Sequence, residues 1–211
     1  YPEALPHVRG CVLVLDELNR ANLSSVLGEC MFLLEADKRG DQNAVQLLYG
    51  RDSFSLPENL LVLGLMNTAD RSIALVDYAL RRRFAFVDLP PRFNESFKAY
   101  LRDRLVPDRI IDRLFEAIAE VNGAIRSAHV ALGRGFEIGH SYFCKCPDLT
   151  ALADEPERER AAEDWIEEVI RFDIAPLLRE YWFDDRDARS GLVRTLLGRD
   201  LSEADSELLV D

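Results

Sequence analysis

Two adjacent carboxylates follow a short apolar run near the start of the chain. Residues 12–15 are all apolar, and Asp16 and Glu17 come directly after them. Such a run is typical of a strand buried on both faces, and open α/β sheets bind ligands beyond the carboxyl ends of their strands. One carboxylate could hold Mg²⁺, which prefers oxygen ligands, while the other deprotonates a water. The pair therefore indicates phosphoryl-transfer chemistry, with a helix cap as the alternative.

A polar side chain also ends the next apolar run. Residues 60–65 are apolar or glycine, and Asn67 follows in the string Met-Asn-Thr-Ala-Asp-Arg-Ser at 66–72. An asparagine amide can hydrogen-bond both a γ-phosphate and a water. Asn, Thr, Asp and Ser also favour turns, so a simple turn remains the alternative.

Three consecutive arginines, Arg81, Arg82 and Arg83, end a short helix predicted over 74–83. Guanidinium groups match phosphate oxygens and can stabilise charge on a transferred phosphoryl group. A helix C-terminus also favours cations, which would account for one or two of the three.

The elements around these side chains predict an α/β arrangement. Apolar runs at 12–15, 60–65 and 84–89 predict buried strands of a parallel sheet. The apolar spacing over 23–34 predicts an amphipathic helix, and the alternation over 45–56 predicts a β-hairpin.

The pattern changes after Pro90 and Pro91. Apolar stripes with helical spacing follow, above all over 110–125 and 165–181, and no buried-strand run recurs. We therefore predict an α/β domain over residues 1–91 and a mostly helical domain over residues 92–211.

Composition limits the possible functions. The 211 residues include 26 Lys+Arg and 38 Asp+Glu, a net charge of −12, with 48% hydrophobic residues. These values rule out disordered and collagen-like chains, and the acidity argues against a direct nucleic-acid clamp. No apolar run approaches the ~20 residues of a membrane span, and the four cysteines lack the spacing of a zinc site. We expect a cytoplasmic protein whose chain contacts neither membrane nor DNA directly.

Three strings together carry a family resemblance. They are Val-Leu-Val-Leu-Asp-Glu-Leu-Asn-Arg-Ala-Asn at 12–22, Met-Asn-Thr-Ala-Asp-Arg-Ser at 66–72 and Leu-Val-Asp-Tyr-Ala-Leu-Arg-Arg-Arg-Phe at 75–84. In this order they resemble the McrB-type AAA+ NTPases, the motor subunits of modified-cytosine-specific restriction systems. Ile-Gly-His-Ser-Tyr-Phe at 138–143 and Ile-Ala-Pro-Leu-Leu-Arg-Glu-Tyr at 174–181 extend the resemblance. It implies a partial AAA+ P-loop NTPase core, a parallel sheet with helices, followed by a helical lid domain.

The resemblance also implies roles for the acidic and amide side chains. Asp16 corresponds to the Walker B residue that holds Mg²⁺, and Glu17 to the base that activates the attacking water. Asn67 corresponds to the sensor-1 asparagine, which contacts both nucleotide and water. Asp70 corresponds to the acidic residue of the same motif, which helps to place the water.

The matching arginines would act at subunit boundaries. Arg20 and Arg71 occupy family positions near the subunit interface, where they would help to bind the nucleotide. Arg82 and Arg83 match the arginine-finger region, which acts on the neighbouring subunit's nucleotide. Asp77 is placed to pair with one of these arginines.

One family motif has no counterpart in these residues. The phosphate-binding Walker A loop, G-x-x-x-x-G-K-[ST], requires a Gly-Lys pair, and the chain holds none. We expect the segment that carries this loop, and the family's modified-DNA-reading domain, to precede Tyr1. Mg²⁺ and GTP or ATP would then bind only once the loop is supplied.

Two classes of function stay open at this stage. The first is an NTP-hydrolysing motor that works as a homo-oligomeric ring with a nuclease subunit of McrC type. The second is a catalytically incomplete ring or interaction module that supplies an arginine to its neighbour. An ATPase of a MoxR-like or dynein-related AAA+ branch is a further alternative.

Overall fold

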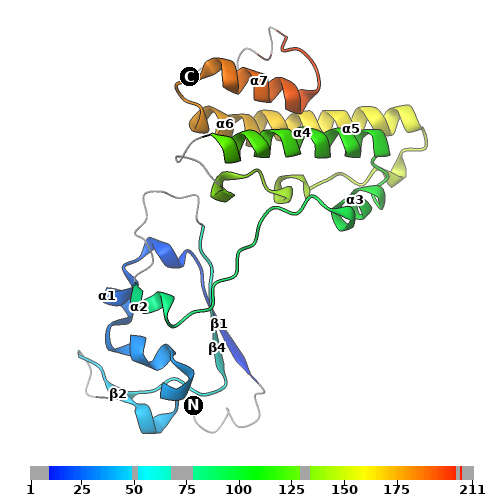
Figure 1. The fold of residues 1–211 in the computed structure, drawn as a ribbon. Helices are drawn as coiled ribbons and strands as arrows, with labels where there is room; N and C mark the ends of the chain where they lie inside the picture. The colour runs from blue at the N-terminus through cyan, green and yellow to red at the C-terminus, as the bar shows by residue number, and fades with distance from the viewer. Residues whose placement is uncertain (1–9, 49–51, 68–77, 129–133, 203–204, 206–211) are drawn as a thin grey trace. The chain divides into compact units, whose positions relative to one another are not determined.

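The computed structural model describes residues 10–48, 52–67, 78–128, 134–202 and 205 (Figure 1). The chain forms two compact units, an N-terminal unit, Tyr1–Asp88, and a helical unit, Leu89–Asp211.

Two parallel strands form the base of the N-terminal unit. β1, Cys11–Leu15, pairs with β4, Leu60–Gly64, in a register that runs from Cys11 opposite Leu60 to Leu15 opposite Gly64. The strands predicted at 12–15 and 60–65 and their parallel pairing are therefore confirmed, whereas the burial predicted for them is not found in the described residues. Because the pairing is parallel, the carboxyl ends of both strands lie at the same edge of the sheet.

Among the described residues, one face of this sheet is partly covered and the other is exposed. Leu15 and Val62 pack against a small core. Its buried members are Leu18, Leu34 and Leu80. On the opposite face Val12 and Leu61 are 59% and 62% exposed. Parallel sheets are usually buried on both faces, but within the described part of the chain no residue of β1 or β4 is buried, and Leu13, on the same face as Leu15, is 43% exposed.

The helix predicted over 23–34 is wrong as a single element. α1, Leu23–Leu27, ends at Gly28, whose φ of 46° breaks the helix, and Gly28–Leu34 continues as a 3₁₀ segment. Glycine adopts positive φ without a steric cost. The apolar spacing still brings Leu33 and Leu34 into the interior.

The remaining short elements complete the N-terminal unit. The predicted hairpin is confirmed, because β2, Val45–Gln46, pairs antiparallel with β3, Ser53–Phe54. The described part of the second predicted helix is α2, Tyr78–Arg81. The strand predicted over 84–89 is wrong: these residues form neither strand nor helix. Three further 3₁₀ turns lie at Leu18–Arg20, Ala36–Lys38 and Asp41–Asn43.

The helical unit packs its helices around one apolar core. The helices are α3, Glu95–Arg102; α4, Asp108–Ser127; α5, Glu155–Val169; α6, Ala175–Tyr181; and α7, Arg186–Leu197. A π-helical segment, Ile170–Ile174, joins α5 to α6. Short 3₁₀ turns lie at Arg134–Phe136, His140–Phe143 and Leu149–Ala151. The apolar stripe predicted over 110–125 is confirmed, since Ile110, Ile118 and Ile125 are at most 1% exposed.

A buried asparagine ties α4 to the segment that follows it. Asn122 is 5% exposed. Its Oδ1 accepts a hydrogen bond from the backbone N–H of Ile138 at 2.6 Å, and its Nδ2 donates to the Ile138 carbonyl at 3.0 Å. One side chain thus satisfies both backbone groups of a buried residue, as burial requires.

Asn122→Ala should lower the free energy of unfolding by roughly 2–4 kcal/mol, because it leaves two buried backbone groups without a partner. Urea unfolding followed by far-UV circular dichroism measures the loss. Asn94→Ala is the control, because it removes only the cap that accepts from Phe97 N–H and should cost about 1 kcal/mol. Equal losses in the two variants would contradict the role given to Asn122.

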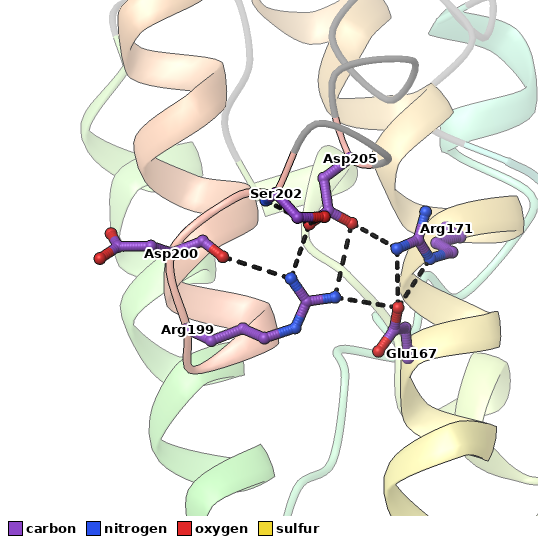
Figure 2. A network of polar contacts seen from close by, with 6 residues as sticks. All are labelled: Glu167, Arg171, Arg199, Asp200, Ser202 and Asp205. Carbon is purple, nitrogen blue, oxygen red and sulfur yellow. Dashed lines mark hydrogen bonds and ion pairs between the residues drawn. The ribbon is translucent and has the colours of Figure 1, made fainter.

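A buried carboxylate fastens the segment after α7 to α5 and the π-helical segment (Figure 2). The side chain of Asp205 is fully buried, and its Oδ2 lies 2.6 Å from Arg199 Nη1. The same oxygen accepts from the N–H and the hydroxyl of Ser202, both at 2.7 Å, and Oδ1 pairs with Arg171. Glu167 joins both guanidinium groups, at 2.7 Å from Arg171 and 3.0 Å from Arg199. The Arg199 guanidinium holds the pKa of Asp205 well below its usual range.

Because the folded-state pKa of Asp205 is depressed, its contribution to stability is present above the unfolded pKa of about 3.9 and is lost as the pH falls below it. Asp205→Asn should therefore cost roughly 3 kcal/mol at pH 7. The difference in the free energy of unfolding between Asp205→Asn and the wild type should become smaller as the pH falls from 5 to 2. Urea unfolding over this pH range measures both effects, and Asp200→Asn, an exposed change in the same segment, should show neither.

Candidate functional site

The two carboxylates after β1 have separate surroundings. Asp16 is exposed, and its Oδ1 accepts a hydrogen bond from the backbone N–H of Glu17 at 2.9 Å. Glu17 is half-buried, and its Oε2 lies 3.2 Å from the Nε of Arg20. The first carboxylate is therefore open to a hydrated cation, whereas the second is oriented by an arginine.

Glu17 has an uncommon backbone conformation. Its φ of 51° and ψ of 43° lie in the left-handed region, where non-glycine residues are rare. Such strain persists only where the surroundings fix it, and it is often found at functional sites. Leu18 supplies the fixing contact, because it is 7% exposed and its N–H donates to the Leu65 carbonyl at 2.9 Å.

The end of β4 lies beside this loop. Leu65 N–H donates to the Leu15 carbonyl at 2.9 Å, and Asn19 Nδ2 donates to the Asn67 carbonyl at 3.0 Å. Asn67 itself is exposed. The structure thus brings Asp16, Glu17 and Asn67 to one edge of the sheet.

Sequence reasoning missed Asn19. It stands three residues after Asp16 in the 12–22 string, but its partner is a backbone carbonyl 48 residues away. The presence of an asparagine in a loop after a strand indicates only a turn. Its link to the neighbouring strand depends on the parallel pairing of β1 with β4.

Leu18 and Gly64 pack closely at the same edge of the sheet. A Cβ atom placed on Gly64 would lie 2.6 Å from Leu18 Cδ2. The absence of a side chain at the last position of β4 therefore gives Leu18 the space in which it seals the loop.

The arginines after α2 contact a different group of residues. Arg83 Nη2 lies 2.8 Å from Glu35 Oε1, whereas the side chain of Arg82 is exposed. Both arginines line an open hollow of about 590 Å³ within the N-terminal unit. Asp70, Arg71 and Asp77 lie outside the described residues.

Among the described residues, the carboxylate of Asp16 fits a magnesium site that is shared with substrate phosphates. In the described part of the chain, no group of three or more His, Cys, Asp or Glu side chains could hold a metal ion. Mg²⁺ often binds through one carboxylate, several waters and substrate phosphates, which Asp16 could satisfy. Cys146 is buried, and burial raises the pKa of its thiol to about 11, which disfavours the thiolate that zinc needs.

Both units of the chain match known protein families. Residues 3–84 match the AAA domain of the dynein-related subfamily, and residues 113–189 match the alpha-helical lid domain of McrB. The chain belongs to the McrB-type AAA+ proteins. The predicted fold class, a parallel AAA+ sheet with helices followed by a helical lid, is confirmed. The dynein-related branch, which the sequence analysis treated as an alternative, is the subfamily that its AAA part matches.

Two curated relatives are restriction components. The chain is 44% identical over 191 residues, 89% of its length, to the "Type IV methyl-directed restriction enzyme EcoKMcrB subunit" of Escherichia coli (strain K12). It is 31% identical over 88 residues, 36% of its length, to the "Type II restriction enzyme BsuMI component YdiS" of Bacillus subtilis (strain 168). The matched segments cover 40% and 25% of these relatives. Among the described residues of this McrB-type chain, no helix is both long and apolar enough to cross a membrane.

Asn19→Ala should cost about 1 kcal/mol of stability and should speed amide hydrogen exchange at Met66 and Asn67, because it removes the bond that ties the two strand ends. Exchange followed by NMR or mass spectrometry measures this. Asn22→Ala is the matched control: it removes a cap on Ser25 N–H, 3.1 Å away, in the same loop. It should cost a similar energy without a selective effect at Met66 and Asn67. Indistinguishable exchange patterns would refute the link.

Proposed function

We propose that this edge of the sheet is the water-activating half of a nucleoside triphosphate hydrolysis site in a restriction motor. The observation that supports the proposal is the meeting of Asp16, Glu17 and Asn67 at the paired ends of β1 and β4. Hydrolysis of a phosphoanhydride needs a cation site, a base and a polar group that orients water, and these three side chains provide the corresponding chemistry.

Each side chain has a distinct role in this proposal. Asp16 would hold the hydrated cation, and bound Mg²⁺ would neutralise charge on the phosphates. The carboxylate of Glu17 would accept a proton from the attacking water. The amide of Asn67 would donate to the γ-phosphate and accept from the same water, and Asp70 would help to place that water.

The pairing of Glu17 with Arg20 keeps the base oriented without locking it. The two side chains are 43% and 60% exposed, and exposed ion pairs contribute less than about 1 kcal/mol. Arg20 could therefore leave Glu17 for a phosphate with little loss from this ion pair. Arg71 would bind nucleotide beside it, and Arg82 or Arg83 would reach the neighbouring subunit's triphosphate as an arginine finger.

The phosphate-binding loop must come from residues other than these, because the chain contains no Gly-Lys pair. The proposed side chains touch only phosphate, metal and water, so they would accept GTP or ATP. We propose that residues 1–91 carry the nucleotide chemistry and residues 92–211 act as the lid. The assembly would be a homo-oligomeric ring in the cytoplasm with a nuclease partner of McrC type, in which DNA is contacted elsewhere.

A second function is favoured by one observation. The exposed side chain of Arg82 is available to a neighbour even where the chain's own site is incomplete. The chain would then serve as a ring module that completes another subunit's site.

Glu17→Gln separates these functions in the natural gene product that contains these residues. It should leave magnesium-dependent nucleotide binding within twofold of wild type and lower turnover by roughly 10²–10⁴-fold, because the amide cannot accept the proton. Equilibrium binding of a fluorescent GTP or ATP analogue and phosphate release measure the two.

Asp16→Asn is the variant for comparison with Glu17→Gln. Because it removes the proposed magnesium ligand, it should weaken the magnesium-dependent binding of nucleotide and not only turnover. Turnover by Glu17→Gln at the wild-type rate would remove Glu17 from the role of base. Wild-type protein that neither binds nor hydrolyses nucleotide would favour the ring module.

A further inference from the structure

The turn after α2 is fixed by its backbone. The N–H groups of Arg83 and Phe84 both donate to the Leu80 carbonyl, at 2.9 Å and 3.2 Å. Leu80 is 1% exposed, and Phe84 packs against the same small core. The backbone of residues 82–84 therefore has little freedom, and the directions of its side chains follow from it.

Glu35 holds the side chain of Arg83 within the unit. It follows the buried Leu34 at the end of the 3₁₀ segment Gly28–Leu34, where its backbone turns extended at φ −67° and ψ 131°. Its Oε1 lies 2.8 Å from Arg83 Nη2, and the two side chains are 38% and 21% exposed. The pair thus connects the end of that segment to the turn after α2.

A second arginine of the same hollow is also engaged internally. Arg39 donates from Nη2 to the Leu34 carbonyl at 3.1 Å and from Nη1 to the Leu60 carbonyl. Arg39, Arg82 and Arg83 all line the hollow. Of these three, Arg82 is the one whose side chain is exposed.

We propose that Glu35 is a positioning residue: it retains Arg83 within the unit and leaves Arg82 as the arginine presented to a neighbouring subunit's triphosphate. The proposal rests on the finger role given above to this pair of arginines. To act in trans, Arg83 would have to leave a close ion pair and expose a mostly covered side chain, whereas Arg82 is exposed and makes no ion pair with any described residue. Two adjacent arginines thereby have different tasks.

The first test uses the 211-residue chain and an arginine reagent, p-hydroxyphenylglyoxal, with peptide mass spectrometry. Arg82 should react at least fivefold faster than Arg83. Glu35→Gln should raise the rate at Arg83 at least threefold and leave the rate at Arg82 unchanged. Asp37→Asn is the matched control, because Asp37 also lines the hollow but pairs with Lys38 at 2.9 Å, and it should leave the ratio unchanged. Equal rates in the wild type would overturn the proposal.

The second test exchanges the two charges. Glu35→Arg and Arg83→Glu should each lower the urea midpoint of the N-terminal unit, and the double variant should recover most of the loss because the ion pair is restored with reversed sign. No recovery in the double variant would show that the pair does not position the turn.

The third test measures phosphate release by the natural gene product. Arg82→Ala should lower turnover at least 100-fold with an unchanged urea midpoint, whereas the folded charge-exchange double variant should lose less than tenfold. A double variant that folds but is as inactive as Arg82→Ala would assign the finger to Arg83 and overturn the proposal. A wild type without turnover would instead refute the proposed function, while the reagent and urea tests would still decide the role of Glu35.

Discussion

The parallel pairing of β1 with β4 is the constraint on which the N-terminal unit depends. Its register places Leu15 opposite Gly64, so the chain leaves both strands at the same edge. Leu18 then folds back over the glycine and fixes Glu17 in its left-handed conformation. If the strands were antiparallel, the carboxylates and Asn67 would lie at opposite ends of the sheet.

The two units are stabilised in different ways. The helical unit buries long apolar stripes, adds the Asn122 bonds and closes its C-terminal segment around the fully buried Asp205. The N-terminal unit has a small core and an apolar sheet face that the described residues leave exposed. Its site therefore lies on the less buried part of the chain, where local opening costs least free energy.

Arginine supplies most of the positive charge of this acidic chain, and the exposure of each ion pair separates the roles of these arginines. Arg171 and Arg199 are held by a buried carboxylate, which makes them structural. Arg20 forms an exposed ion pair with Glu17, which contributes little to stability, and the pair of Arg83 with Glu35 is intermediate in exposure. The charge of these arginines does not distinguish their roles. The degree to which each ion pair is buried does.

The sequence by itself indicated β1 and β4, the apolar stripe of the lid and the order of Asp16, Glu17 and Asn67, because these follow from apolar period and local motifs. It did not determine the break at Gly28, where a backbone angle outweighed the apolar pattern, or the irregular backbone over 84–89, for which the described residues offer no pairing strand. Only the tertiary structure showed the contacts of Asn19 and Glu35, since each depends on a partner 48 residues away in the chain. The local sequence determines which interactions a side chain can make. Long-range packing determines which partner it makes them with.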